Sequence, residues 1–419
     1  MHPDDLLAPG TPAYRLSPAA GRLILLFSLC VLAAPTAAHA QRDSTPTATA
    51  PRDTTPATAA STADPGMPWL DSFYPFFPSL GNNFPLIALH LELRRGADYF
   101  ARTPYSGIFS IDLGSGFTGA RLAVARFHAP LLWKDMRLAA TAGTTRESRL
   151  GYFGVGNNTT FDSKLVTKSQ PHFYEARRTR YFGQVEVSRR LKGPLWIAGA
   201  AGVEHSNLSD LSGPSLFRTD IGSSDLSDTD VRGRVTLVLD TRDNEFNTTR
   251  GVFGQASFGG GTGGDGYSRI TADLRGYVPV REGTVFALRV AGSGMTKKAP
   301  LNARYEMPAW EQDVPVLGGT YSNRGVAFQR LAGRGVLFAN AEVRHDLLSL
   351  GDLGAFTLIG YFDAGRVFEQ ESFRLTTKDM KIGAGGGLAI RILRFAIWTF
   401  NFGGGPDGFQ FSAGSGWSF

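Results

Sequence analysis

The sequence predicts an all-β fold, a transmembrane antiparallel β-barrel. From about Met67 onward, short segments alternate apolar with polar residues and are separated by Gly, Asn, Asp and Ser clusters. The 419 residues include 51 glycines and 30 phenylalanines, which suit a curved sheet with aromatic girdles facing lipid. After the first forty residues no run of 18 apolar residues occurs, so we expect no membrane-spanning helix in that part of the chain.

The N-terminal segment has the pattern of an export signal. Two arginines precede a short apolar core over residues 23–34, and a small-x-small cleavage site follows over residues 38–40. This pattern predicts a signal peptide over residues 1–40 that is cleaved after Ala40. Two alternatives stay open: an uncleaved helical anchor, for which the core is short, and a lipoprotein signal at Cys30, which the bulky residue before that cysteine fits poorly.

Composition limits what the rest of the chain can be. Residues 41–66 are almost all Thr, Ala, Pro, Ser and Asp and predict a disordered periplasmic linker, with the barrel over residues 67–419. Cys30 is the only cysteine, so the mature chain should hold neither a structural disulfide nor a cysteine-bound metal, and no histidine pattern indicates zinc. We therefore expect no metal and no cofactor. The net charge of +6 is spread along the chain and predicts no nucleic-acid partner.

The alternation places apolar side chains on one face of each expected strand and charged or hydroxyl side chains on the other. In the final segment, Phe409, Phe411, Trp417 and Phe419 share the apolar face. A soluble sandwich also alternates, but a membrane barrel turns its apolar face to lipid and its polar face to the lumen. Export, the aromatic C-terminus, the strand lengths and the lack of cysteine together favour the barrel.

The expected strands can be placed from the C-terminus backward. They cover residues 408–419, 395–403, 379–392, 354–366, 336–348, 283–295, 266–280, 250–260, 231–241, 194–205, 176–191, 135–146, 117–127, 106–114 and 86–95. With Phe419 on the periplasmic side, periplasmic connections are short and external ones mostly long, which is typical of outer-membrane barrels, although the link at 114–117 is short. A closed barrel needs an even number of strands, so one more is expected between Trp69 and Phe84.

Four motifs in order resemble the outer-membrane assembly superfamily, the surface-antigen barrel shared by BamA, TamA and the two-partner secretion transporters. They cover residues 239–251 (LDTRDN followed by TRG), residues 317–325 (LGGTYSNRG), residues 340–344 (NAEVR) and residues 361–365 (YFDAG). The resemblance is good over residues 230–419. Each motif alone is weak, but four in the right order on the expected elements are specific.

The resemblance implies a barrel of about sixteen strands with its long external loop folded into the lumen. It assigns the lumen-loop motif to Arg324 and Gly325, the strand-turn motif to Asp240, Arg242, Asp243 and Gly251, and the C-terminal strand signal to Trp417 and Phe419. The chain departs from the family pattern in the residues on either side of Arg324-Gly325. It also departs in lacking room within residues 41–66 for a periplasmic polypeptide-transport-associated domain, so we expect a member without those domains.

Arg324 has two interpretations. Glu342 and Asp363 face the lumen by parity on neighbouring strands, and the rigid fork of an arginine can bind a carboxylate through two hydrogen bonds. Arg324 would then dock the loop from about residue 294 to 335 inside the barrel by bonding one or both carboxylates. The residues alone favour the other interpretation, a solvated loop arginine, and the resemblance favours the docked loop. The strand-turn residues also fit ordinary turn chemistry.

The function implied by the resemblance is assistance to protein insertion into, or transport across, the bacterial outer membrane. No nucleophile elbow or phosphate loop occurs, so we do not expect an enzyme. The implied partners are outer-membrane lipid, unfolded outer-membrane client proteins and a periplasmic partner. A seam between the first and last strands would pair an incoming strand, and Gly414 and Gly416 either kink the last strand or ease its packing. The alternative function is a passive pore or structural barrel without assembly activity.

Overall fold

The structure is a computed structural model. It describes residues 69–76, 78, 86–96, 102–103, 105–296, 299–311, 313–369, 376–392 and 396–419. The expected signal peptide, its cleavage site and the expected linker lie outside the described residues. They stay predictions.

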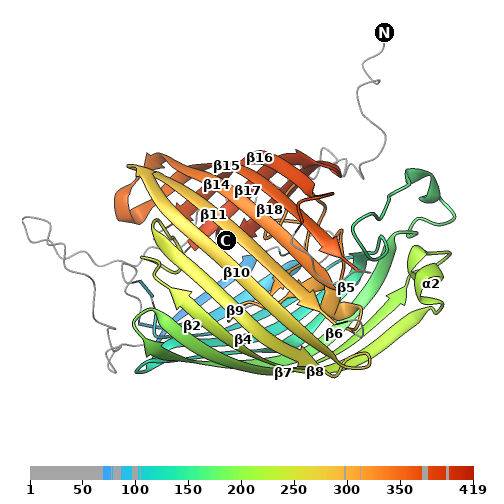
Figure 1. Ribbon diagram of the computed structural model, residues 1–419, viewed down its shortest axis with the longest axis horizontal. Coiled ribbons are helices and arrows are strands. Elements are labelled where there is room, and N and C mark those ends of the chain that lie inside the picture. The colour runs from blue at the N-terminus through green and yellow to red at the C-terminus, as the bar shows by residue number, and fades with distance from the viewer. Residues whose placement is uncertain are drawn as a thin grey trace, which may run out of the picture. The chain divides into compact units, whose positions relative to one another are not determined.

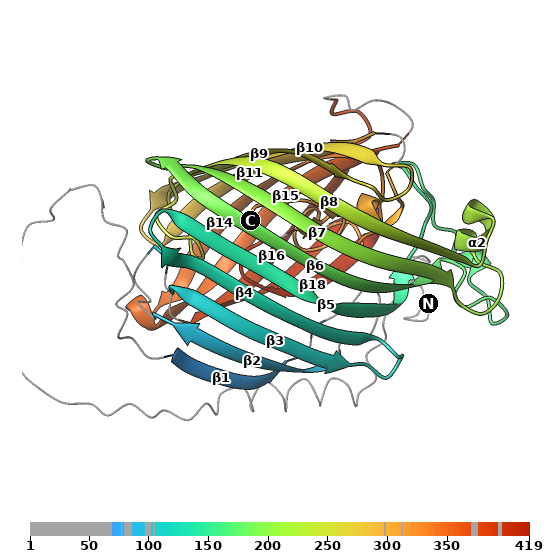
Figure 2. The same cartoon turned by 90° about the horizontal axis from the view of Figure 1, so that it is seen from below.

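Sixteen strands form one antiparallel sheet in which each strand pairs with its neighbour in the chain. Figures 1 and 2 show this sheet curling into a barrel. The strands of this sheet are β1 (Trp69–Phe76), β2 (Ile87–Arg95), β3 (Gly107–Ser115), β4 (Arg121–Trp133), β5 (Met136–Gly151), β6 (Glu175–Lys192), β7 (Leu195–Asp210), β8 (Asp225–Asp240), β9 (Gly251–Gly261), β10 (Tyr267–Arg281), β11 (Thr284–Met295), β14 (Gly335–Ser349), β15 (Gly354–Phe368), β16 (Lys381–Ile392), β17 (Ala396–Gly405) and β18 (Gly408–Ser415).

The remaining elements are short and lie in connections. Strands β12 (Glu306–Met307) and β13 (Val314–Pro315) pair with each other in the segment between β11 and β14. The helices are η1 (Ser163–Leu165), α2 (Leu216–Ile221), η2 (Asn302–Tyr305) and η3 (Gly351–Leu353). No helix in the described part of the chain has the length and apolar character that crossing a membrane requires.

The predicted fold class is confirmed, and so is the place of the sixteenth strand, which is β1. The clearest difference lies in β6, β7 and β8, which have 18, 16 and 16 residues. We expected β8 to begin at residue 231, but it begins at Asp225. Its first six residues, DLSDTD, are mostly polar on both faces, so the apolar periodicity could not mark them.

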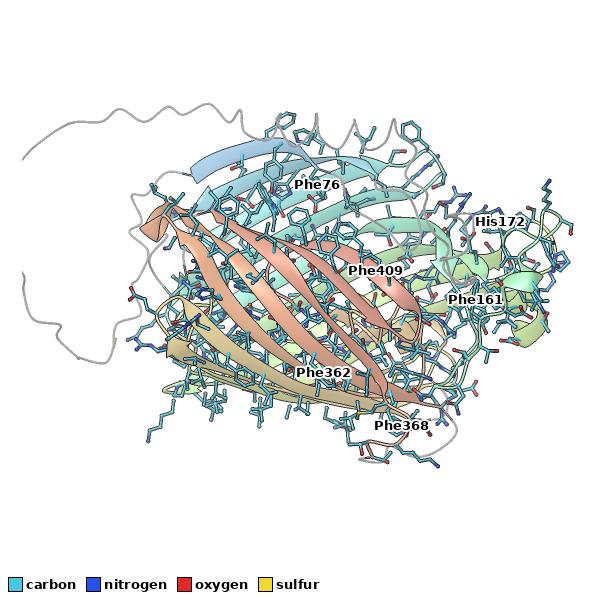
Figure 3. All side chains as sticks on the ribbon, turned by 90° about the horizontal axis from the view of Figure 1, so that it is seen from above. Phe76, Phe161, His172, Phe362, Phe368 and Phe409 are labelled. Atoms are coloured by element: carbon cyan, nitrogen blue, oxygen red, sulfur yellow. The ribbon has the colours of Figure 1, made fainter. Side chains whose placement is uncertain are left out.

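The side chains are arranged apolar outside and polar inside. Leu237, Ile270 and Phe362 are 49%, 64% and 50% exposed on the outer face, where Figure 3 shows Phe362 pointing away from the wall. Charged side chains such as Asp273 and Glu342 are buried on the inner face. An outer surface this apolar would be unfavourable in water, whereas in a bilayer it lies against hydrocarbon.

The two ends of the barrel differ in their connections. At the end where β18 finishes, which we call the near end, several turns are tight: residues 134–135, 193–194 and 282–283. At the far end, residues 152–174, 211–224 and 296–334 form the longest connections. The connection at residues 116–120 is short although it lies at the far end, as the sequence indicated.

Candidate functional site

Residues 296–334, which we call the lumen loop, enter the barrel from the far end. Their apolar side chains, among them Leu317 and Val326, pack in one buried cluster with wall residues such as Phe338 of β14 and Val367 of β15. The loop is therefore a folded part of the interior. Charged side chains also fix it to the wall at several places, among them one around Arg324 and one around Glu311.

The first place is centred on Arg324. Its Nε donates to Asp363 Oδ2 at 2.8 Å and its Nη2 to Asp363 Oδ1 at 2.7 Å, a bidentate pair. Its backbone N–H also donates to Asp363, at 2.9 Å, and its Nη1 donates to Glu342. The guanidinium lies 3.7 Å from the centroid of the Tyr361 ring. We call Arg324, Glu342 and Asp363 the arginine junction.

The charges of the arginine junction are compensated. Burial alone would lower the pKa of Arg324, but Glu342 and Asp363 raise it above its ordinary value, so the guanidinium stays charged. Glu342 also accepts from Arg344 Nε, at 2.7 Å. Two arginines thus face two carboxylates in an interior where an unpaired charge would be costly.

Gly325 brings the loop backbone against the wall. A Cβ at this position would lie 2.5 Å from Gly383 Cα in β16, 2.7 Å from the Gly404 carbonyl and 3.0 Å from Gly405 Cα in β17. Distances this short to backbone atoms leave no room for a side chain. The Arg-Gly motif therefore combines an ion pair to β14 and β15 with a close backbone contact to β16 and β17.

The last residues of the chain join this junction, and here one expectation was wrong. We expected Trp417 and Phe419 on the lipid-facing side of a strand reaching residue 419, but β18 ends at Ser415. Gly416 has a φ of +82°, which breaks the alternation. Phe419 is 8% exposed and its carbonyl accepts from Arg344 Nη2 at 3.0 Å.

Residues 416–419, which we call the tail, also contact the arginine junction. Ser418 Oγ accepts from Arg324 Nη1 at 3.1 Å, so the tail bonds the arginine junction directly. Of the two glycines discussed for the last strand, Gly416 supplies the kink, whereas a Cβ at Gly414 would meet Thr320 and Thr399 at ordinary van der Waals distances. The role of Trp417 and Phe419 as a C-terminal signal stays a prediction.

The second place is centred on Glu311, at the opposite part of the wall. Arg137 of β5 donates to Glu311 through Nε at 2.6 Å and Nη2 at 3.1 Å. The same guanidinium donates to Glu245 at 2.9 Å through each of its two terminal nitrogens. His128 Nε2 of β4 lies 2.9 Å from Glu311 Oε2. We call Glu311, Arg137, Glu245 and His128 the glutamate junction.

An aromatic anchor supports the glutamate junction. Trp310 packs between Trp196 and Phe253, with ring centroids 6.1 Å away in both cases. Its Nε1 donates to Ser188 Oγ at 2.8 Å. The guanidinium of Arg137 lies 4.6 Å from the Trp310 ring centroid. An indole with a satisfied N–H holds the tip of the loop in one position.

The strand-turn motif shapes the turn that presents Glu245. Asp240 accepts from Arg242 Nε and Nη2, both at 2.9 Å. Asp243 Oδ1 accepts from the backbone N–H groups of Thr249 and Arg250 at 3.0 and 3.2 Å, which closes the turn. Gly251 has a φ of +113°, and a Cβ there would lie 2.5 Å from the Thr241 carbonyl. These contacts are structural turn chemistry, and they also set the position of Glu245.

The loop and the wall carry opposite charges along their contact. Between residues 306 and 313 the loop is acidic: Glu306 pairs with Arg180 at 2.5 Å and Asp313 with Arg234 at 2.9 Å. Further along it is basic, where Arg324 meets the carboxylates of β14 and β15. Sequence reasoning missed the acidic half. Parity would have put Arg137 and Arg234 on the lumen face, but no local motif marks their partners.

The described residues hold no group of three or more His, Cys, Asp or Glu side chains that could bind a metal ion. The buried carboxylates described above all bond arginines. The arrangement can therefore fix a loop inside a barrel and link it to the last residues of the chain.

Comparisons with known proteins agree with this architecture. A family model described as "Omp85 superfamily domain" matches residues 135–417, more than half of the chain. A search of curated proteins gave no match.

Solved structures share the fold. The crystal structure of BamA from Haemophilus ducreyi lacking POTRA domains 1-3 aligns with a TM-score of 0.53 at 12% identity, covering 82% of this chain and 68% of that one. CdiB from Escherichia coli aligns with a TM-score of 0.53 at 12% identity, covering 82% of this chain and 61% of that one, which is less than two thirds of its length. At such identities the likeness shows the fold alone.

Proposed function

The chain belongs to the Omp85 superfamily, and we propose that it inserts proteins into the outer membrane or moves them across it, as members of this family do. The observation that carries the proposal is the family match, because it spans the wall from β5 onward together with the lumen loop. The BamA and CdiB likenesses support the barrel, and the activity itself is our inference.

The structure supports a barrel whose first and last strands form a weak seam. The sheet order puts β1 and β18 at its two edges, and each has 8 residues, against 18 in β6. Short edge strands offer few backbone hydrogen bonds to each other. An incoming strand can pair with such an edge, since strand addition uses the same backbone groups.

The last strand is also interrupted at the near end. Gly416 turns the chain inward, so residues 417–419 leave the edge that β18 would otherwise continue. Pairing with β17 ends at Gly416, whose N–H donates to the Ile397 carbonyl at 2.8 Å. We propose that this end of the seam is where a client strand first pairs.

The implied surroundings follow from the apolar outer face. We propose that the barrel lies in the outer membrane with its near end toward the periplasm, after export by the expected signal peptide. Its partners would be outer-membrane lipid, unfolded outer-membrane proteins as clients, and a periplasmic protein that delivers them. No observation favours catalysis.

Reconstitution tests the proposal. The purified barrel is placed in liposomes, and the folding of a small urea-unfolded outer-membrane barrel is followed by its heat-modifiable gel mobility. Faster folding than in protein-free liposomes and in liposomes holding a porin of unrelated fold is the expected result. Equal folding rates in all three would contradict it.

Conductance separates the proposal from the alternative, a passive pore or structural barrel. Because the lumen loop is bound to the wall at both the arginine junction and the glutamate junction, it lies across the lumen. We therefore expect small, intermittent currents in a planar bilayer. A large, steady current that scales with salt, together with unchanged client folding, would instead establish the passive pore.

A further inference from the structure

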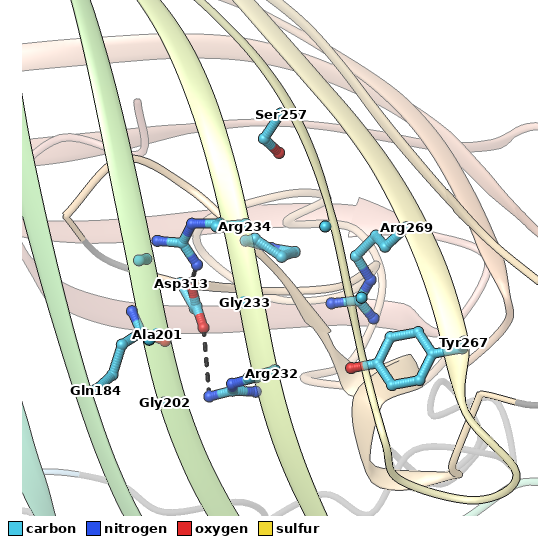
Figure 4. Close-up of a pocket in the computed structure, with 14 residues that line it drawn as sticks. Gln184, Ala201, Gly202, Arg232, Gly233, Arg234, Ser257, Tyr267, Arg269 and Asp313 are labelled. Atoms are coloured by element: carbon cyan, nitrogen blue, oxygen red, sulfur yellow. Dashed lines mark hydrogen bonds and ion pairs between the residues drawn. The ribbon is translucent and has the colours of Figure 1, made fainter.

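A cavity lies between the lumen loop and the inner face of β8, β9 and β10, apart from both junctions. Figure 4 shows Arg232, Arg234, Arg269 and Tyr267 around it, with Asp313 of the loop on one side. The cavity has ≈ 30 Å³ of space for the centres of water-sized molecules. This space is large enough for water or for one small ion.

Arg269 is the unusual member of this group. It is 7% exposed, yet no carboxylate among the described residues lies within ion-pair distance of its guanidinium. Its Nη2 donates to the Ala303 carbonyl and contacts the Met295 sulfur, and its Nε is buried without a partner. A buried guanidinium ordinarily has an anionic partner, because removing the charge from water is costly.

The nearby carboxylates are occupied by other arginines. Asp313 pairs with Arg234 at 2.9 Å and lies 3.6 Å from Arg232. Glu204, on the neighbouring strand, pairs with Arg180 at 2.8 Å and lies 3.4 Å from Arg232. Asp313 is thus shared by two arginines that line the cavity, and Arg269 adds a third cation.

Small residues create the space. Ala200, Gly202 and Gly259 face the lumen where larger side chains would fill the wall, and Gly202 and Gly259 stand in register with Arg232 and Arg269. A Cβ at Gly259 would lie 2.3 Å from the Gly233 carbonyl, so no side chain can project into the cavity from this position. The hydroxyl of Ser257 borders the same space.

We propose that this cavity binds one small inorganic anion of the chloride or phosphate class, held by Arg269 and Arg232. The anion accepts hydrogen bonds from the guanidinium nitrogens that the protein leaves free and compensates the charge of Arg269. The volume fits a small ion and is too small to enclose a peptide segment. The site goes beyond the proposed function and does not depend on it.

Binding is measured on the purified barrel in detergent micelles. Sodium chloride or sodium phosphate replaces sodium gluconate at constant ionic strength, and the thermal unfolding midpoint is recorded. A saturable upward shift of about 2 °C or more is expected for at least one of the two anions. A midpoint that does not respond to either anion would overturn the proposal.

Two variants and one control assign the effect to the cavity. Arg269→Gln should bind the responding anion about tenfold more weakly by titration calorimetry. Arg275→Gln is the matched control: it lies on the same face of β10, and its partner Asp273 keeps Arg289. It should bind the anion as the unchanged protein does.

Ser257→Asp keeps the proposal testable if Arg269→Gln does not fold. A fixed carboxylate in the cavity should raise the unfolding midpoint in gluconate and abolish the anion response. An anion response of unchanged size in Ser257→Asp, or in a folded Arg269→Gln protein, would overturn the site.

Discussion

At the arginine junction the lumen loop supplies the cation and the wall supplies the carboxylates, whereas at the glutamate junction the loop supplies the carboxylate and the wall the arginine. The two lie on different parts of the wall, β14–β15 and β4–β5. A loop that exchanged its two contact points would bring Arg324 to Arg137 and Glu311 to the carboxylates of β14 and β15, so like charges would meet at both places. The opposite polarity of the two junctions therefore favours one direction of the loop.

The junctions also differ in how the backbone is held. At the arginine junction the loop backbone touches the wall through glycines, Gly325 against Gly383 and Gly405. At the glutamate junction wall side chains bind the loop backbone, since the Trp310 N–H donates to Gln255 at 2.7 Å and the Glu311 N–H to Glu186 at 3.0 Å, and the Trp310 indole fills the space. The first contact depends on the absence of side chains and the second on a large one, so different substitutions should break them.

The largest effect is expected from Arg324→Ala. It leaves Glu342 and Asp363 buried, with Asp363 losing its bidentate partner, and breaking such a pair costs about 3–5 kcal/mol. Urea unfolding followed by gel mobility, and protease cleavage within residues 296–334, would show lower stability and a released loop. Arg324→Lys should be intermediate, because a point charge cannot replace the planar fork. Unchanged cleavage and stability would refute the docking role.

Arg137→Gln should cost about 2–4 kcal/mol, since Glu311 retains His128 while Glu245 loses its main partner. The same unfolding measurement applies.

A double variant that combines Arg137→Gln with Arg324→Ala compares the two junctions directly. We expect a loss smaller than the sum of the two, because a loop freed at one junction gains less from the other. Strict additivity would mean that the junctions are independent.

Gly325→Ala tests the backbone contact alone and should cost about 1–3 kcal/mol through the clash with β16 and β17. Gly404→Ala is the matched control, because a Cβ there meets nothing within 4 Å. Equal stability of the two variants by urea unfolding would show that the close contact is unimportant.

The smallest effect is expected from lowering the pH, which acts on the glutamate junction. Burial alone would raise the pKa of Glu311 and Glu245, but Arg137 lowers both below the ordinary value. Because the folded pKa lies below the unfolded one, the stabilisation is present above roughly pH 4.5 and is lost as the pH falls through the folded pKa. Loop cleavage by an acid-active protease should therefore rise below that pH. In Glu311→Gln this rise should be smaller, and an unchanged rise would exclude Glu311 as its source.

The strands of the wall and the arginine junction could be predicted from the sequence for a physical reason. Strand parity places Glu342 and Asp363 on the inner face, and the Arg-Gly motif points to Arg324, so both partners carry local signals. The glutamate junction joins residues far apart in the chain, such as Arg137 and Glu311, and neither stands in a motif. Only the fold brings them together.

The last residues show the opposite limit. Alternation placed Trp417 and Phe419 outside because the count assumed an unbroken strand, yet one left-handed glycine at position 416 reverses the direction of the side chains. A glycine in a strand pattern is compatible with both outcomes, and the interior contacts that decide between them are not visible in the local sequence.

The contacts of the lumen loop have a consequence for the order of folding. The loop leaves the wall after β11, but its carboxylate needs β4 and β5 and its arginine needs β14, β15 and Ser418 near the very end of the chain. The full set of docking contacts therefore forms only once the last strand has been made and placed. The time at which the loop becomes protected from protease would then report when the final step of barrel folding occurs.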